Sequence, residues 1–134
     1  MNYENLETKI KIQFQNKDLL ATALTHRSYL NENRSYPLPH NERLEFLGDA
    51  VLELITTEFL YRSYENPEGD LTNLRSALVN YRLLSEIAKD IGLEAFILLS
   101  RGEAKDNGRA RQVILANAIE ALIGAIYLDR KSVV

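Results

Sequence analysis

The segment from residue 40 to residue 54, HNERLEFLGDAVLEL, constrains this chain most, because carboxylates recur at helical spacing within an otherwise apolar run. In a helix, at about 100° per residue, four acids share a stripe roughly 80° wide: Glu42, Glu45, Asp49 and Glu53. Aliphatic residues occupy much of the remaining circumference, so the stripe must run beside or into a core. Like charges on one face repel, and something must compensate them.

A second segment, residues 113–128, is almost wholly apolar, and its two strongly polar side chains are Asn117 and Glu120. They are three residues apart and therefore share one helix face. An unpaired ionised carboxylate in a buried helix is costly, or its pKa rises until it is neutral. Two helices that present oxygen ligands in this way can face each other and hold Mg²⁺, which is met by a few carboxylate oxygens and water.

Two glycines support such a crossing. Gly48 and Gly124 lie inside the expected helices, where glycine costs about 0.5–1 kcal/mol relative to alanine. Each therefore indicates close backbone approach. Because Gly124 lies one turn beyond Glu120 on the same face, we expect the two helices to cross there, with their polar side chains within reach of one metal ion.

Helical periodicity dominates the chain, and no internal repeat or low-complexity tract is present. This pattern predicts an all-α fold. The expected helices are residues 2–12, 17–28, 41–64, 71–79, 81–91, a short piece at 95–99, and 109–129. Gly92 and Gly102 follow apolar runs where C-caps belong, and Asp70 can cap the helix that follows it.

The length of 134 residues predicts a single domain with a substantial core. The absence of cysteine excludes disulfides and thiolate zinc sites, and two histidines make a histidine metal site improbable. The start of the chain lacks the features of a signal peptide, and the apolar run at 113–128 is too short and too polar to span a bilayer. We expect a cytoplasmic protein without a membrane partner or an organic cofactor.

The formal net charge of −3 and the pI near 5.4 are unusual for a protein that binds nucleic acid, since affinity for phosphate usually comes from a basic field. A cluster of acids at a metal site would explain how an acidic protein can still bind phosphate. Bound Mg²⁺ reverses the charge there and meets the phosphate itself.

The run HNERLEFLGDAVL closely resembles the signature of the ribonuclease III family, the endonucleases that cut double-stranded RNA. Shorter matches occur at residues 23–29, 67–70, 102–103 and 114–122, and order and spacing fit from about residue 6 to residue 129. The resemblance implies the helical fold of the ribonuclease III endonuclease domain, homodimeric, as one nuclease domain over residues 1–134. Family members commonly carry a double-stranded RNA-binding domain downstream, which is not recognised in this sequence.

The resemblance also assigns roles to individual residues. The catalytic set that it implies is Asp49, Glu120, Glu45, Glu42 and Glu68, with Glu68 as an organiser of ligands. The metal, Mg²⁺ with Mn²⁺ as a substitute, would be held by Glu45, Asn117, Glu120 and Asp49. Without the resemblance, the acidic stripe is equally well explained as a solvated face neutralised by basic residues. Glu120 could likewise be half of a buried Glu–Arg pair.

Asn117 departs from the family pattern, because much of the family has aspartate at this position as a direct metal ligand. Here the ligand would be a neutral amide oxygen. Amide carbonyls do coordinate hard cations, so the site survives in principle with one charge fewer.

Two further features have both a plain and a functional interpretation. Phe46 is either ordinary core or, as the family match implies, a ring that inserts into a pocket of a partner subunit. A basic stretch that runs into the last long helix is either a solvated loop or a grip for RNA phosphates beside the metals. Its members are Arg101, Lys105, Arg109 and Arg111.

The favoured hypothesis is a homodimeric, Mg²⁺-dependent endoribonuclease that cleaves double-stranded RNA by two-metal phosphodiester hydrolysis. The resemblance implies 5′-phosphate and 3′-hydroxyl ends, with ribosomal RNA precursors and structured transcripts as substrates. The alternative is a catalytically impaired relative that binds double-stranded RNA or associates with the ribosome. A dimerisation module without chemistry is a third reading.

Overall fold

The computed structural model of this protein describes residues 2–130. Within them the chain forms α-helices joined by short loops and one 3₁₀ helix, η1, and the prediction of an all-α fold is confirmed. Their bounds are α1 (Glu4–Ile10), α2 (Lys17–Ala23), α3 (Arg27–Glu32), α4 (Glu42–Ser63), α5 (Glu68–Leu78), α6 (Tyr81–Asp90), η1 (Leu93–Phe96), α7 (Arg101–Lys105) and α8 (Arg109–Arg130).

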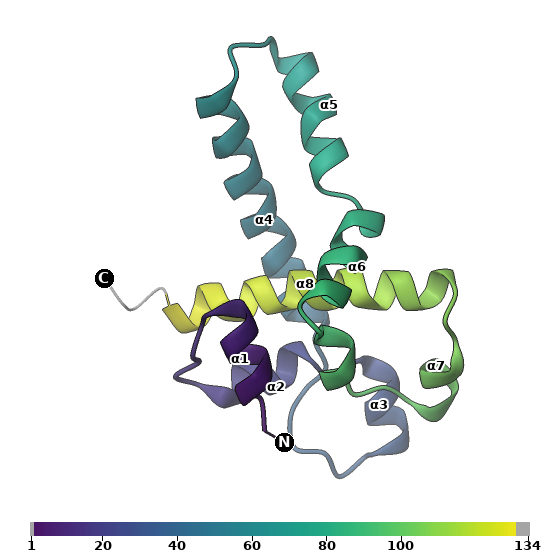
Figure 1. Cartoon of the computed structure of the whole chain (residues 1–134). Coiled ribbons are helices and arrows are strands. Elements are labelled where there is room, and N and C mark those ends of the chain that lie inside the picture. Colours follow the sequence, from purple (N-terminus) through teal and green to yellow (C-terminus); the bar gives the residue numbers. More distant parts are fainter. Residues whose placement is uncertain (1, 131–134) are drawn as a thin grey trace.

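Helix α8 is the centre of the fold. It runs across the middle of the molecule, with α1–α3 on one side of it and the hairpin of α4 and α5 projecting from the other (Figure 1). Leu115 on α8 packs in one cluster with Leu20, Leu24 and Leu93, and all four side chains are fully buried or nearly so. Each buried leucine contributes about 1.5–3 kcal/mol relative to an exposed one.

By length and composition α8 is also long and apolar enough to cross a membrane, which differs from the expectation based on the shorter run at 113–128. However, 61% of its most apolar window is buried inside the fold. That burial is typical of the central helix of a globular core, where neighbouring helices cover the apolar surface.

The crossing of α4 and α8 depends on the two glycines inside them, as predicted. A Cβ atom added to Gly48 would overlap the carbonyl oxygen of Glu120, and one added to Gly124 would overlap that of Leu44. The two backbones are therefore in direct contact at this point. No other residue type fits either position without moving a helix.

The far part of α4 and all of α5 form a hairpin that stands away from the core (Figure 1). Its large apolar side chains are exposed, among them Leu54, Phe59 and Tyr61. Arg75 on α5 links the two helices through Thr57 Oγ1 at 3.0 Å and Glu53 at 3.7 Å. The hairpin is thus held by few contacts and presents apolar surface outward.

The helix predicted over residues 17–28 is interrupted in the structure. The chain leaves the helix after Ala23, and α3 begins at Arg27. Thr25 forms an isolated parallel β-bridge with Leu98, whose N–H donates to Leu24 O at 2.8 Å and whose carbonyl accepts from His26 N–H at 3.0 Å. These bonds join segments more than 70 residues apart, so helical periodicity could not reveal the break.

Smaller differences concern the ends of helices. Gly92 ends α6 with φ +73°, as a C-cap glycine should. Gly102, by contrast, lies inside α7, a short helix that was not predicted. Asp70 is in the first turn of α5 and does not cap it, because α5 already begins at Glu68.

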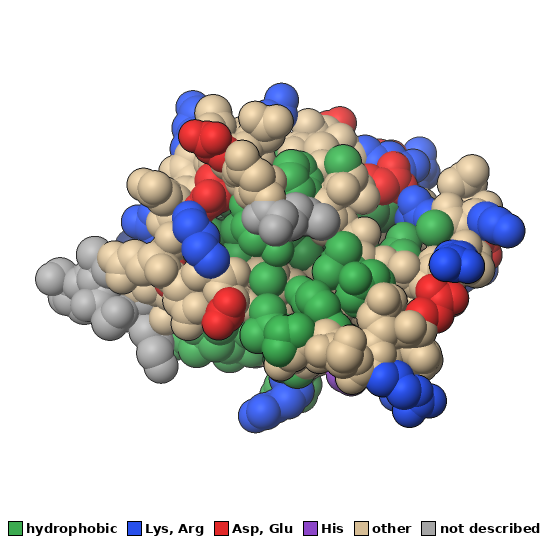
Figure 2. Space-filling view, turned by 90° about the horizontal axis from the view of Figure 1, so that it is seen from below, with side chains coloured by type: hydrophobic (Ala, Val, Ile, Leu, Met, Phe, Trp, Pro, Cys, Tyr) green, Lys and Arg blue, Asp and Glu red, His purple; other side chains and the backbone are tan. Residues whose placement is uncertain are grey.

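The face that α1–α3 cover has apolar side chains in its middle and charged ones around its edge (Figure 2). Acidic and basic side chains alternate along that edge. This mixed face agrees with the small net charge and does not itself present a broad basic field for a nucleic acid.

Candidate active site

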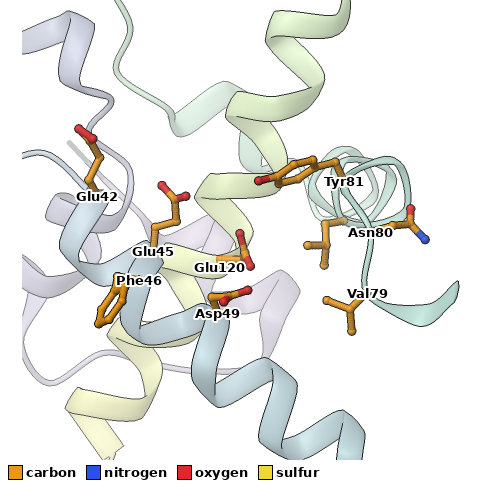
Figure 3. Close-up of a pocket in the computed structure, with 9 residues that line it drawn as sticks. Glu42, Glu45, Phe46, Asp49, Val79, Asn80, Tyr81 and Glu120 are labelled. Atoms are coloured by element: carbon orange, nitrogen blue, oxygen red, sulfur yellow. The ribbon is translucent and has the colours of Figure 1, made fainter. Parts of the chain in front are cut away.

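Four of the predicted acids line one pocket where α4 crosses α8 (Figure 3). Three of them come from successive turns of α4, and the fourth comes from α8. The pocket has a volume of about 620 Å³ and is lined by Glu42, Glu45, Phe46, Asp49, Val79, Asn80, Tyr81, Leu84 and Glu120. The glycine crossing is what brings the two acid-bearing faces together.

Glu120 is the most deeply placed acid of the pocket, with 6% of its surface exposed. Its pKa is raised to about 8, first by burial, then by a hydrogen bond with the Asp49 carboxyl and by the charges of Asp49 and Glu45. The bond between two carboxyls requires a proton on one of them. The pair therefore holds a proton at neutral pH, in the manner expected of like charges that share a site.

Glu45 extends the same cluster toward the rim. Its pKa is also raised, by burial and by the neighbouring charges of Glu42 and Asp49. Every resolved shift in the pocket thus opposes ionisation. A bound cation would reverse this, because a nearby positive charge favours the ionised form of each carboxyl.

Glu42 lies at the rim and is partly neutralised by the chain itself. Arg27 lies 3.5 Å from its carboxylate. His40 Nδ1 is at the same distance, but it also accepts a hydrogen bond from the Glu42 backbone N–H at 3.3 Å. Since an accepting ring nitrogen carries no proton, Arg27 is the cation that balances Glu42.

Asn117 lies one turn before Glu120 on α8 and is not among the side chains that line the pocket. Its Oδ1 atom is buried and has no hydrogen-bond partner among residues 2–130. A buried amide oxygen without a donor is uncommon, and a bound cation or water is one way to satisfy it. Its assignment as a metal ligand stays a prediction.

Among residues 2–130, no group of three or more His, Asp or Glu side chains is close enough to enclose a metal ion as the structure stands. This does not remove the acids as ligands, because Mg²⁺ is commonly held by one or two carboxylates and keeps several waters. The donors present, carboxylate and amide oxygens, are those that hard divalent cations prefer.

Glu68 is not brought to this pocket. It begins α5 at the outer end of the hairpin, whereas Glu45 and Asp49 are at the inner end of α4 (Figure 1). It lines a separate cavity there, with Tyr61, Tyr64 and other residues of the hairpin. Its predicted role as an organiser of metal ligands gains no support from the geometry of a single chain.

The structure separates the four basic residues that were predicted to contact RNA phosphates. Arg111 is 9% exposed and its Nη1 is 2.7 Å from Glu94 Oε2, while Nη2 donates to the carbonyls of Glu103 and Ala104. It holds η1 and α7 against α8, so the phosphate contact predicted for it is wrong. Arg101 and Lys105 are exposed at the two ends of α7, and Arg109 is exposed at the beginning of α8, about three turns from Glu120.

Phe46 is 82% exposed and lies between two pockets. One is the acidic pocket, and the other is an apolar cavity of about 780 Å³. The second cavity is lined by Leu19, Thr22, Pro39, His40, Glu42, Arg43, Leu44, Phe46, Leu47 and Leu128. The interpretation of Phe46 as ordinary core is therefore wrong for the single chain.

The wall opposite the acids was not predicted. It comes from the junction of α5 and α6 and includes Val79, Asn80 and Tyr81. The sequence does predict a helix that begins at Tyr81. Nothing in local spacing, however, indicates that this helix start faces residues 30 to 40 positions away.

Comparisons with known proteins agree with this geometry. Residues 16–133 match the family model described as ribonuclease-III-like. The chain belongs to the ribonuclease III family. It is 49% identical to proteins named Ribonuclease 3 from Streptococcus pneumoniae strains Hungary19A-6 and D39, over 93% of this chain and 54% of theirs. The chain thus spans about half the length of these curated relatives.

Two solved structures of the nuclease domain of ribonuclease III from Campylobacter jejuni are also similar. Both are 44% identical in sequence and cover 96% of this chain, with TM-scores of 0.86 and 0.84 over 86% and 84% of the respective chains. One of them concerns structural flexibility in a region of that domain involved in dimer formation. The family assignment and the all-α nuclease-domain fold are therefore established for this chain.

Proposed function

We propose that this protein is a homodimeric endoribonuclease that hydrolyses phosphodiester bonds of double-stranded RNA with the help of a divalent metal ion. One observation carries the proposal. A buried carboxyl, Glu120, faces the carboxyls of two further acids and receives no bond from a cation or an N–H group of the described residues. Family membership agrees with it, because the named relatives are ribonucleases.

The residues present fit a hard divalent cation. Glu45, Asp49 and Glu120 offer carboxylate oxygens, and the unpartnered Oδ1 of Asn117 offers a neutral one. When bound, such an ion would neutralise the acids, lower the pKa of a bound water and stabilise charge on the phosphate. Asn117 supplies no charge, so we expect weaker metal affinity than an aspartate would give.

The reaction proposed is in-line hydrolysis. Water adds to the phosphorus, the bond from phosphorus to the 3′-oxygen breaks, and that oxygen takes a proton, which leaves 5′-phosphate and 3′-hydroxyl ends. With a cation bound, the Asp49–Glu120 pair would be ionised and could then accept the proton of the attacking water. Glu42 would orient the site from its rim through its pair with Arg27.

The homodimer is supported by Phe46 and the apolar cavity beside it. A ring that is 82% exposed and a cavity lined by leucines occur on the same face of one chain. A two-fold interface uses one patch twice, so each subunit can insert its ring into the cavity of the other. Two acidic pockets would then face one RNA duplex.

Incubation of the protein with a long RNA duplex tests the proposed activity directly. We expect cleavage with Mg²⁺ or Mn²⁺ and none in chelator, with single-stranded RNA and duplex DNA as substrate controls. Binding of duplex RNA in chelator without cleavage under any metal would overturn the proposal. It would instead support the catalytically impaired, RNA-binding relative that Asn117 also suggests.

Sedimentation tests the dimer separately. Phe46→Asp should produce monomers that do not cleave duplex RNA, because a charge would enter the apolar cavity. Tyr61→Asp is the matched control, since Tyr61 is 77% exposed on the same helix but lies at the hairpin end. A Phe46→Asp variant that remains dimeric would contradict the interface.

A further inference from the structure

The wall of the acidic pocket opposite α4 is built rigidly. Asn80 Oδ1 accepts from Leu83 N–H at 2.9 Å and so caps α6, while its Nδ2 donates to Ala77 O at 3.0 Å at the end of α5. One side chain thus ties the last turn of α5 to the first turn of α6. Tyr81, the first residue of α6, is held on the pocket wall by this clamp.

The Tyr81 side chain extends from that wall into the pocket. Its ring is 52% exposed, and its hydroxyl points toward Glu45 and Glu120 on the opposite side (Figure 3). Within residues 2–130 the hydroxyl makes no hydrogen bond. A phenol that projects over an acidic cleft and has no bond of its own is free to bond a ligand.

Tyr81 also differs from every other side chain that lines the pocket. Four of the nine lining residues are acids and three are apolar, which leaves Asn80 and Tyr81. The amide of Asn80 is engaged in the clamp, and the proton shared by Asp49 and Glu120 stays within that pair. The Tyr81 hydroxyl is therefore the uncommitted side-chain donor in the lining.

We propose that Tyr81 is a substrate-contacting residue, whose hydroxyl donates a hydrogen bond to an oxygen of the RNA backbone in this pocket. The inference rests on the proposed function. The acceptor is a non-bridging phosphate oxygen or a ribose 2′-hydroxyl, both of which an RNA duplex presents to a protein. A neutral donor suits this place, because it adds no positive charge that would compete with a cation for the acids.

Tyr81→Phe tests this with the least disturbance, since it removes the hydroxyl and keeps the ring. Tyr127→Phe on α8 is the matched control, because Tyr127 is 47% exposed and does not line the pocket. Single-turnover cleavage of a short RNA duplex in Mg²⁺ should fall on the order of tenfold for Tyr81→Phe, the size of one lost hydrogen bond. It should be unchanged for Tyr127→Phe. The melting temperature and sedimentation of both variants should match the wild type.

Modified substrates identify the acceptor. Duplexes with 2′-deoxyribose at the nucleotides beside the cut, or with one sulfur at the scissile phosphate, are cleaved by wild type and by Tyr81→Phe. If the 2′-hydroxyl is the acceptor, the variant loses little further activity on the deoxy substrate. If a phosphate oxygen is the acceptor, the same holds for one phosphorothioate isomer.

Failure of this inference is distinct from failure of the proposed function. Wild-type protein that cleaves RNA, together with a Tyr81→Phe variant that cleaves equally fast, overturns the role of Tyr81 alone. A loss that is additive with both substrate changes, or a variant that has become monomeric, also overturns it. Wild-type protein that does not cleave duplex RNA overturns the proposed function and this inference with it.

Discussion

Helix α8 carries two carboxylates that are equally buried, each 6% exposed, but their surroundings are opposite. Near the end of the helix, Asp129 accepts hydrogen bonds from the backbone N–H groups of Gln15 and Asn16, both at 2.9 Å. In the middle of the helix, Glu120 faces other acids and receives no such bond from the part of the chain that the structure describes. Burial of an acid is therefore not what marks a candidate site.

Glu7, a neighbour of Asp129, differs from Glu120 in the direction of its pKa shift. Glu7 accepts from Phe14 N–H at 2.7 Å and from Lys17. Burial alone would raise the pKa of Glu7, but the bonds from Lys17 and Phe14 outweigh it and lower the pKa. The pKa of Glu120 is instead raised to about 8. Acids that accept hydrogen bonds from backbone N–H groups or a lysine stabilise this fold, whereas a buried acid without such donors is available to bind a ligand.

The largest effect should come from Glu120→Gln. Removing a carboxylate that would meet the metal should lower the rate of RNA cleavage on the order of 10³-fold, the size seen when one group that stabilises charge is lost. The free energy of unfolding in chelator should be unchanged or higher, because glutamine can be buried beside Asp49 without taking up a proton, whereas Glu120 must take one up to fold. Glu53→Gln is the control, since Glu53 is exposed on α4 and outside the pocket. If Glu120→Gln cleaves RNA at the wild-type rate, Glu120 is not a functional acid, and its contrast with Asp129 does not identify the site.

Next in size is Gly48→Ala, which tests the crossing that buries Glu120. The added methyl would meet the backbone of α8, which cannot turn away as a side chain can. We expect the free energy of unfolding to fall by at least about 3 kcal/mol. Gly69→Ala in α5 is the matched control, because nothing lies within 4 Å of its added Cβ. Denaturant titration measures both, and equal stabilities would show that the helices can separate without loss.

The crossing is also where the sequence was most informative. Glycines inside apolar helices, at residues 48 and 124, indicated close backbone approach, and the acids of both helices were correctly expected to meet. This succeeded because helical spacing places residues of one face together without knowledge of the rest of the chain.

Other parts could not be predicted, because they depend on contacts distant in sequence. The break at Thr25 is stabilised by the bridge to Leu98, and the buried position of Arg111 by Glu94 and the carbonyls of α7. The length of α4, by contrast, was predicted from the helical pattern, and this length carries Glu68 away from the acidic pocket. Family resemblance names such residues but does not show where one chain places them.

A smaller effect is expected at the other carboxylate of α8. Asp129→Asn keeps one acceptor oxygen but turns an NH₂ group toward the second backbone N–H. We expect the free energy of unfolding to fall by about 2–3 kcal/mol, since a bond between an N–H group and a charge is lost and a donor is left unpaired. Cleavage per folded molecule should be unchanged. A large loss of cleavage with no loss of stability would place Asp129 among the functional acids.

The smallest effect is the dependence of stability on pH in chelator. It tests the contrast between buried acids with and without hydrogen-bond donors in a single experiment. Between its ordinary value of 4.5 and its native pKa of about 8, Glu120 holds a proton in the folded protein that the unfolded chain releases. Stability therefore falls as pH rises through this range. Glu120→Gln should remove that fall.

For Glu7 we expect stability to change with pH in the opposite direction. Its lowered pKa means that the unfolded chain holds the proton first, so its contribution to stability is present above the ordinary pKa and is lost as pH falls below it. Glu7→Gln should flatten the acid side of the curve and leave the alkaline side unchanged. Subtracting each variant curve from the wild type cancels the titration of His26, whose pKa is lowered by burial. If both difference curves slope in the same direction, the two acids do not differ in the sign of their pH-dependent contribution to stability. The presence of hydrogen-bond donors would then not decide the direction in which this fold shifts the pKa of a buried carboxylate.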